Sequence, residues 1–282
     1  PMAFIDWKMP SGDPESIVLL AHGLNLRPER MEALAALHRA HGAVTGVCVM
    51  PGHGPGSPPA GFRLAGRNSN DLARGDAGAF LRAAEEAVEE VRRAKERFSV
   101  SRSRFVGNSL GALVVLTALV RRPAPAHRGA AVFDDAILLA PALALRRRAR
   151  LLEVPARRLP GWVPVPSFSR PRDRIYHFLP LGAYRVLYHL LAEFRSGLSG
   201  PAPEAAPLRL PMRIYLDPED ELVHPPGIRR LVRDGLLPGA RLIPAPESTG
   251  RPAHLMVDRA SLGELLWNDL LAYVERSSRS ST

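Results

Sequence analysis

Strand-length apolar runs recur along this sequence, and stretches with helical spacing separate them. Ser16–Ala21 and residues 136–140 are apolar runs that lack the alternation of a half-exposed strand. Such runs are typical of strands covered on both faces, as in parallel sheets. Residues 28–40 and 110–120 lie between such runs and repeat apolar side chains at the spacing of one helix face. The alternation predicts an α/β fold with a mostly parallel central sheet flanked by helices.

The remaining segments continue this pattern along most of the 282 residues. Apolar residues make up 46% of the chain and charged residues 23%, an ordinary balance for a soluble globular protein with one large domain. We expect further strands at 3–9, 44–50, 104–106, 213–216 and 241–244, and further helices at 71–98 and 262–275.

Residues 146–200 interrupt the pattern. This interval is rich in proline, arginine and aromatic residues and has no clear parallel strand. A stretch of this length without sheet signals is unlike a simple loop. We therefore predict an inserted, largely helical cap at 146–200, which divides a core made of residues 1–145 and 201–282.

The basic charge is carried almost entirely by arginine. The formal net charge is +10, and Lys8 and Lys95 are the only lysines among 38 basic residues. Such a skew is typical of a biased genome composition, and the sequence lacks the basic and aromatic pattern of a nucleic-acid site, so we expect no nucleic-acid partner. Residues 146–200, however, hold eleven arginines against three acids. The cap could attract anionic acyl substrates or an anionic membrane surface, or it could present a solvated arginine face.

Other features limit the chemistry. Cys48 is the single cysteine, so an intrachain disulfide and a cysteine-based metal cluster are excluded, and its apolar surroundings predict an inert core thiol. The first residues lack a basic region followed by an apolar stretch, and residues 106–120 are too short and too polar to span a bilayer. We expect a soluble, cytoplasmic protein.

A Gly-x-Ser-x-Gly pattern occupies residues 107–111. It follows a predicted strand and opens an apolar helix, so Ser109 would lie on a tight turn with its hydroxyl exposed at the strand's carboxyl end. A helix-capping serine in a nucleotide-binding turn is the other interpretation. The absence of a phosphate-binding lysine and of a full glycine-rich fingerprint disfavours it. Ser109 is therefore the predicted nucleophile.

A serine nucleophile needs a base and a carboxylate that orients it. Residues 217–225 form an acidic loop after a predicted strand, and four carboxylates compete there. The spacing of Asp220 to Val223 and Pro225 favours Asp220, whereas Asp217 is the alternative and suits a turn before Pro218. His254 follows the last predicted strand and is the predicted base, with His224 as the alternative.

Together these motifs resemble the α/β-hydrolase superfamily, and most closely its monoacylglycerol-lipase and lysophospholipase-like serine esterases. The resemblance rests on the sequences at 18–24 and 50–54, on the Ser109 turn, and on the Asp220 and His254 loops. It implies the order Ser109, Asp220, His254 and an oxyanion hole made by the backbone N–H groups of Leu24 and Leu110.

The resemblance also implies that His22 and His53 are structural residues. The sequence departs from the family pattern at Asn108, where a histidine is common, and at Ala112, where a further glycine is common. We expect a small-molecule acyl ester as substrate and hydrolysis through an acyl-enzyme, without a metal or an organic cofactor. Acyl transfer, thioester hydrolysis and a noncatalytic binding protein on the same fold are the alternatives.

Overall fold

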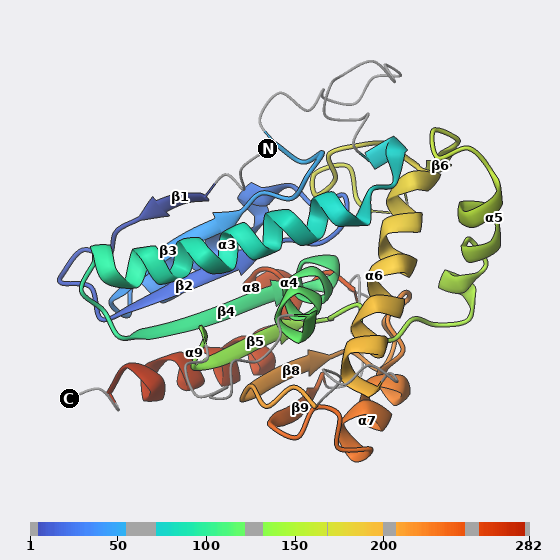
Figure 1. Ribbon diagram of the computed structural model, residues 1–282. Coiled ribbons are helices and arrows are strands. Elements are labelled where there is room, and N and C mark those ends of the chain that lie inside the picture. Colours follow the sequence, from blue (N-terminus) through green and yellow to red (C-terminus); the bar gives the residue numbers. More distant parts are fainter. Residues whose placement is uncertain are drawn as a thin grey trace.

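The computed structural model describes residues 5–54, 72–121, 132–167, 169–199, 207–245 and 254–279. Seven strands of this part form one sheet in the order β1-β3-β2-β4-β5-β8-β9 (Figure 1). Only β1 pairs antiparallel, and all the other neighbours in this sheet are parallel. The strands are β1 Ile5–Lys8, β2 Ser16–Ala21, β3 Ala43–Cys48, β4 Arg102–Asn108, β5 Asp135–Leu139, β8 Met212–Leu216 and β9 Ala240–Pro244.

The inner strands are buried on both faces, which explains their continuous apolar sequences. Ile17 and Leu19 of β2 pack into one buried cluster, whereas Val18 and Leu20 pack into another. Successive side chains of a strand point to opposite faces, so a strand covered twice must be apolar at every position. The predicted mostly parallel sheet between helices is confirmed.

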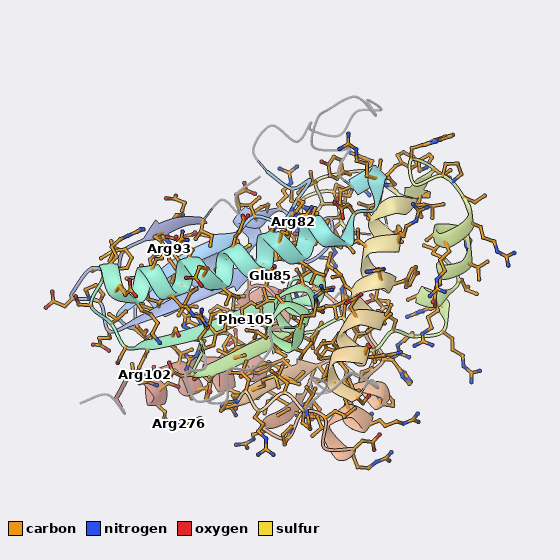
Figure 2. All side chains as sticks on the ribbon, viewed as in Figure 1. Arg82, Glu85, Arg93, Arg102, Phe105 and Arg276 are labelled. Atoms are coloured by element: carbon orange, nitrogen blue, oxygen red, sulfur yellow. The ribbon has the colours of Figure 1, made fainter. Side chains whose placement is uncertain are left out.

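Helices cover both faces of the sheet. One buried cluster holds residues of α3, α4 and α6, and the other holds residues of α1, α8 and α9. Figure 1 shows α3 crossing the sheet, and Figure 2 shows Arg82 and Arg93 along the exposed side of α3. The helices are η1 Pro28–Met31, α1 Glu32–Arg39, α3 Ala77–Arg97, α4 Ser109–Arg121, η2 Arg148–Arg150, α5 Glu153–Arg158, α6 Leu181–Ser199, α7 Pro225–Arg233, α8 Arg259–Leu262 and α9 Glu264–Arg279.

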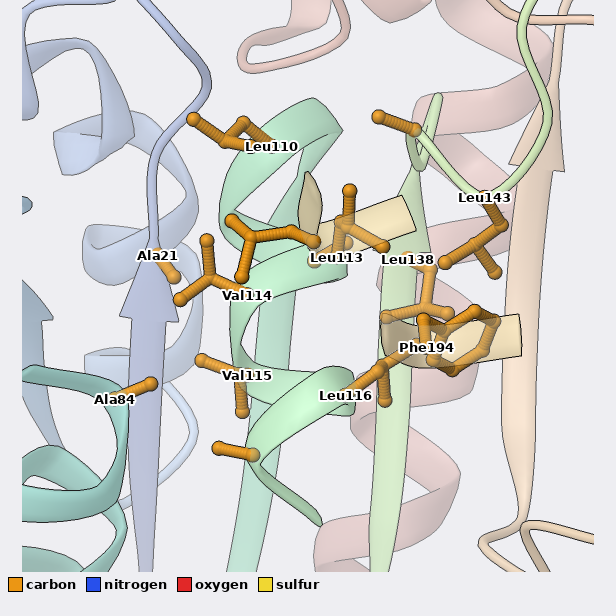
Figure 3. Packing of buried hydrophobic residues seen from close by; sticks show 14 of the residues in the cluster. Ala21, Ala84, Leu110, Leu113, Val114, Val115, Leu116, Leu138, Leu143 and Phe194 are labelled. Atoms are coloured by element: carbon orange, nitrogen blue, oxygen red, sulfur yellow. The ribbon is translucent and has the colours of Figure 1, made fainter. Parts of the chain in front are cut away.

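The interval 146–200 contains η2, α5 and α6 together with a small antiparallel pair, β6 Pro164–Pro166 and β7 Phe178–Pro180. α6 packs into the core, since Phe194 belongs to the same buried cluster as Leu116 and Leu138, as Figure 3 shows. α5 lies outside α6, at the edge of the molecule (Figure 1). Phe168 and residue 200 lie outside the described residues. That this interval acts as a cap stays a prediction.

Two helix boundaries differ from the sequence prediction. The helix predicted from residue 71 is interrupted: residues 72–74 are helical, Gly75 takes a left-handed conformation, and α3 begins at Ala77, where Asp76 caps it by accepting the Ala79 N–H. Residue 71 itself lies outside the described residues. The helix predicted at 262–275 is two helices, because Gly263 has a φ of 77° and ends α8 before α9 begins.

We expect Gly111→Ala to destabilise the fold. A Cβ at position 111 would lie 2.5 Å from the carbonyl oxygens of Ala21 and His22, at the end of β2. Because backbone atoms cannot turn away as a flexible side chain does, the free energy of unfolding should fall by about 3 kcal/mol or more. Urea denaturation measures the change. Gly12→Ala, where a Cβ would meet no described atom within 4 Å, is the control, and equal stabilities of the two variants would contradict the prediction.

Candidate active site

Ser109 lies at an abrupt turn between a strand and a helix. β4 ends at Asn108 and α4 begins at Ser109, whose φ is 48°. A left-handed serine is strained, and such strain is typical of functional turns. A Cβ at Gly107 would lie 2.7 Å from the Cα of Ala112, so the strand and the helix approach more closely than a side chain would allow. This turn presents the Ser109 hydroxyl at the carboxyl end of β4.

His254 faces this hydroxyl. The Ser109 Oγ and the His254 Nε2 are 2.8 Å apart, within hydrogen-bond distance. The other ring nitrogen, Nδ1, lies 2.9 Å from Oδ2 of Asp220 and 3.2 Å from Oδ1. The structure thus brings together the predicted nucleophile, base and carboxylate. In the sequence, Ser109 is 145 residues and Asp220 is 34 residues away from His254.

Two carboxylates of the acidic loop after β8, Asp217 and Asp220, have different hydrogen-bond partners. Asp220 is 1% exposed, and its Oδ1 accepts the N–H groups of Leu222 at 2.8 Å and Val223 at 2.7 Å. Asp217 instead accepts the N–H of Glu219 at 2.8 Å, as a turn residue does. The carboxylate of Asp220, not that of Asp217, therefore contacts the imidazole.

His224 is placed elsewhere. It precedes α7, and its backbone N–H donates to the carbonyl of Ala144 at 2.8 Å. Burial lowers the pKa of its imidazole, and the arginines around it lower it further. The imidazole that contacts Ser109 belongs to His254 instead.

Burial and the Asp220 carboxylate act in opposite directions on the charge of His254. Burial disfavours the imidazolium, but the Asp220 carboxylate stabilises it more, and the pKa of His254 is raised above its ordinary value of 6.5. A base with this environment can take a proton from Ser109 and hold it as an ion pair with Asp220.

The loop after β2 packs against the Ser109 turn. A Cβ at Gly23 would lie 2.7 Å from Oδ1 of Asn108 and 3.2 Å from Cβ of Ser109. Leu24 follows directly, and Leu110 is the second residue of α4, in the first turn, where backbone N–H groups lack helical partners. Leu110 thus directly follows Ser109, and Leu24 follows Gly23, which packs against Ser109; their role in binding an oxyanion stays a prediction. Asn108 donates its side-chain amide to the carbonyl of Leu139 at 3.2 Å.

Two buried histidines shape this loop. The Nε2 of His22 accepts the N–H of Met50 at 3.1 Å, and the Nε2 of His53 accepts the N–H of Asn25 at 3.0 Å. Burial lowers the pKa of His22 to about 4 and that of His53 to about 3. Both rings are neutral at pH 7 and accept backbone N–H groups, as expected of structural residues.

Asn25 is a site residue that the sequence analysis missed. It is 1% exposed, with a φ of 60°. Its amide donates to the Oγ of Ser167 at 2.8 Å and to the carbonyl of Tyr176 at 2.9 Å, and its Oδ1 accepts the Tyr176 N–H at 2.8 Å. The residue after Leu24 is thereby fixed to the 146–200 interval. A lone asparagine in a loop gives no signal of such contacts.

Arg30 joins three parts of the chain. It lies in η1 and forms ion pairs with Asp173 at 2.9 Å and with Asp258 at 2.6 Å. Asp173 belongs to the 146–200 interval, and Asp258 lies four residues after His254. The loops around Ser109 are therefore tied to one another by charge as well as by packing.

Further features of the described part of the chain bear on its chemistry. Cys48 is buried, and burial raises the pKa of its thiol to about 12, which agrees with an inert core residue. Among the described residues, no group of three histidine, cysteine or acidic side chains could hold a metal ion. No described helix is long and apolar enough to cross a membrane.

Comparison with solved structures supports the fold. A lipolytic enzyme from a metagenomic study of LipS and LipT is 19% identical, with 98% of each chain covered and a TM-score of 0.66. A monoacylglycerol lipase of Paleococcus ferrophilus is 18% identical, covers 98% of this chain and 99% of its own, and has a TM-score of 0.64. A monoglyceride lipase of Saccharomyces cerevisiae is 14% identical, covers 99% and 91%, and has a TM-score of 0.65.

A search of curated proteins finds no match. A family model described as serine aminopeptidase, S33, matches residues 12–242, which is most of the chain and includes the Ser109 turn and the Asp220 loop. The α/β sheet, the serine turn and this match lead to one conclusion. The chain belongs to the serine aminopeptidase S33 family of α/β-hydrolases.

Proposed function

We propose that this protein is a serine hydrolase that cleaves carboxylic esters through an acyl-enzyme on Ser109. The observation that carries the proposal is the continuous hydrogen-bonded chain from the Ser109 Oγ through His254 to Asp220. A serine hydroxyl is a weak nucleophile at neutral pH, and such a chain supplies both a base and a group that stabilises the resulting imidazolium.

The reaction follows from the geometry. His254 takes the Ser109 proton as Oγ attacks the ester carbonyl, and Asp220 stabilises the charged ring. The backbone N–H groups of Leu24 and Leu110 bind the oxyanion. His254 then donates the proton to the leaving alcohol, and water, activated by the same imidazole, releases the acid.

The family description raises peptide amino-terminal hydrolysis as a second candidate. Such a reaction calls for a carboxylate that is free to bind the substrate's ammonium group. The three acids of the 146–200 interval are each paired with an arginine, at distances of 2.7, 2.9 and 2.6 Å for Glu153–Arg157, Asp173–Arg30 and Glu193–Arg121. Because each of these carboxylates is already paired, none of the three offers a free charge to a substrate's ammonium group, and we favour an ester substrate.

Labelling with a fluorophosphonate probe tests the nucleophile. We expect wild-type protein to be labelled and Ser109→Ala to be neither labelled nor active, with a loss in kcat on the order of 10⁶. Ser199→Ala, at an exposed serine of α6, is the matched control and should label normally. Absence of labelling in folded wild-type protein would contradict the proposal.

The same preparations assign the substrate class. Hydrolysis of a short neutral ester, a monoacylglycerol, a lysophospholipid, an acyl thioester and an amino-acid anilide is compared at equal enzyme concentration. We expect the esters to be hydrolysed fastest. Faster cleavage of the anilide would favour the aminopeptidase, and faster cleavage of the thioester would favour a thioesterase.

The pH dependence should follow His254. The base must be neutral, so kcat/KM should fall as the pH drops through the His254 pKa. Asp220 and, more weakly, Glu221 raise this pKa. Asp220→Asn should move the acid limb to lower pH and reduce kcat by about 10⁴-fold.

Glu221→Gln is the milder variant, because Glu221 is exposed and does not contact the imidazole. It should move the acid limb slightly in the same direction and leave the plateau of kcat nearly unchanged. The profiles are measured by titrating the released acid at constant pH. An acid limb that both substitutions leave in place would show that another group limits the reaction.

Asn25→Asp tests the positioning of the oxyanion loop. The substitution keeps the size of the side chain but removes the donor to Ser167 and Tyr176 and places a charge in a buried site. We expect kcat to fall about tenfold while KM for a short ester changes little, since the loop positions Leu24 rather than the ester's substituents. Asn268→Asp, at an exposed residue of α9, is the control. A change confined to KM would contradict this role.

A further inference from the structure

The segment 147–162, which runs from η2 through α5 to the following turn, exposes large apolar side chains. The exposed fractions are 75% for Leu151, 57% for Val154, 47% for Leu159 and 59% for Trp162. These four are half of the strongly exposed large apolar residues found in the described part of the chain. Apolar side chains gathered on one short segment are typical of an interaction surface.

Exposed arginines lie beside these apolar residues in the sequence of the segment. The segment contains five arginines and one acid, Glu153, which Arg157 neutralises at 2.7 Å. Arg147, Arg150 and Arg158 form no ion pair with a carboxylate of the described residues. Figure 2 shows nitrogen-tipped side chains projecting outward around α5. The surface therefore carries a positive charge that is available to a partner.

The inner face of the same segment is fixed to α6. Ala156 is fully buried, and Arg185 donates to the carbonyls of Ala156 at 2.7 Å and Leu159 at 2.8 Å. The Tyr188 hydroxyl donates to the carbonyl of Ala149 at 2.6 Å. The exposed side chains thus project from an anchored backbone, which reduces the entropy lost on binding.

The residues just before this segment, and Arg148 within it, adjoin the active site. The N–H of Ala142 donates to the carbonyl of Ser109 at 3.1 Å, and the N–H of Arg146 donates to that of Leu222 at 2.9 Å. Arg148 donates from Nε to the carbonyl of Glu221 at 2.8 Å. A partner bound to this segment would lie close to the Asp220 loop and hence to the nucleophile.

We propose that the segment 147–162 docks this enzyme on an anionic lipid bilayer. Tryptophan and leucine can insert at the boundary of the acyl chains, and the neighbouring arginines can bind the anionic headgroups. A nucleic acid would bind the arginines but leave the four apolar side chains in water. Docking would bring Ser109 close to acyl esters held in the membrane, and this consequence rests on the proposed function. The docking itself requires no catalysis.

Vesicle flotation tests the proposal, and it uses Ser109→Ala so that binding is measured apart from hydrolysis. The protein should float with vesicles of phosphatidylcholine and phosphatidylglycerol, and much less with phosphatidylcholine alone or at high salt. Failure of hydrolysis in the wild type would then leave docking intact, whereas failure to float with anionic vesicles would overturn docking alone.

Two sets of variants assign the surface. Replacing Arg147, Arg150 and Arg158 by Gln should weaken binding to anionic vesicles about a hundredfold. Replacing Arg92, Arg93 and Arg97 of α3, which are also exposed, removes the same charge and should weaken binding far less. Equal losses would show that total charge, not this surface, governs binding and would overturn the proposal.

The apolar contribution is tested with Leu151→Ser combined with Trp162→Ser. This variant should lose vesicle binding but, on a Ser109 background, keep its activity on a short soluble ester. Leu265→Ser, at a residue of α9 that is 68% exposed, is the matched control. Unchanged vesicle binding by the double variant, with retained binding to heparin or DNA, would identify a polyanion surface instead and overturn membrane docking.

Discussion

Ser109 can present its hydroxyl because β4 stops and α4 starts within a single peptide. The left-handed backbone at Ser109 is strained, and the surrounding packing must hold it in place. Gly107 and Gly111 permit this packing, because a Cβ at either position would collide with the backbone of a neighbouring element. The arrangement of β2, β4 and α4 therefore depends on two positions without side chains, and so does every contact that Ser109 makes.

The loops around this turn are stabilised by buried polar groups that satisfy one another. Neutral His22 and His53 accept backbone N–H groups, and Asn25 exchanges hydrogen bonds with Tyr176. Arg30 joins the 146–200 interval to the loop that carries His254. Burying polar groups is unfavourable unless they are paired, so these contacts favour one arrangement of the loops over others. The geometry of the site therefore depends on these buried polar pairs, which favour a single arrangement of the loops.

The arginines serve two physical purposes. Some are buried and paired, as Arg104 is with Asp135 at 2.7 Å and Arg213 with Asp269 at 3.2 Å, and both lie over the ring of Tyr273. Others, such as those between residues 147 and 158, face outward beside exposed leucine and tryptophan. The total charge of the chain does not separate these groups, because pairing depends on which carboxylates the fold brings near each guanidinium.

The sequence by itself determined the alternation of strands and helices, since strands buried on both faces must be apolar throughout. It also determined Ser109 as the candidate nucleophile, with His254 and Asp220 as its candidate partners. Helix ends at Ala77 and Gly263 depended on local backbone conformations that the apolar spacing does not reveal. Only the tertiary structure decided that Asp220 rather than Asp217 meets His254, that Asn25 anchors the loop after β2 to the 146–200 interval, and that the arginines of 147–158 face outward. Those outcomes depend on contacts between residues far apart in the chain, and no local pattern of side chains encodes such distances.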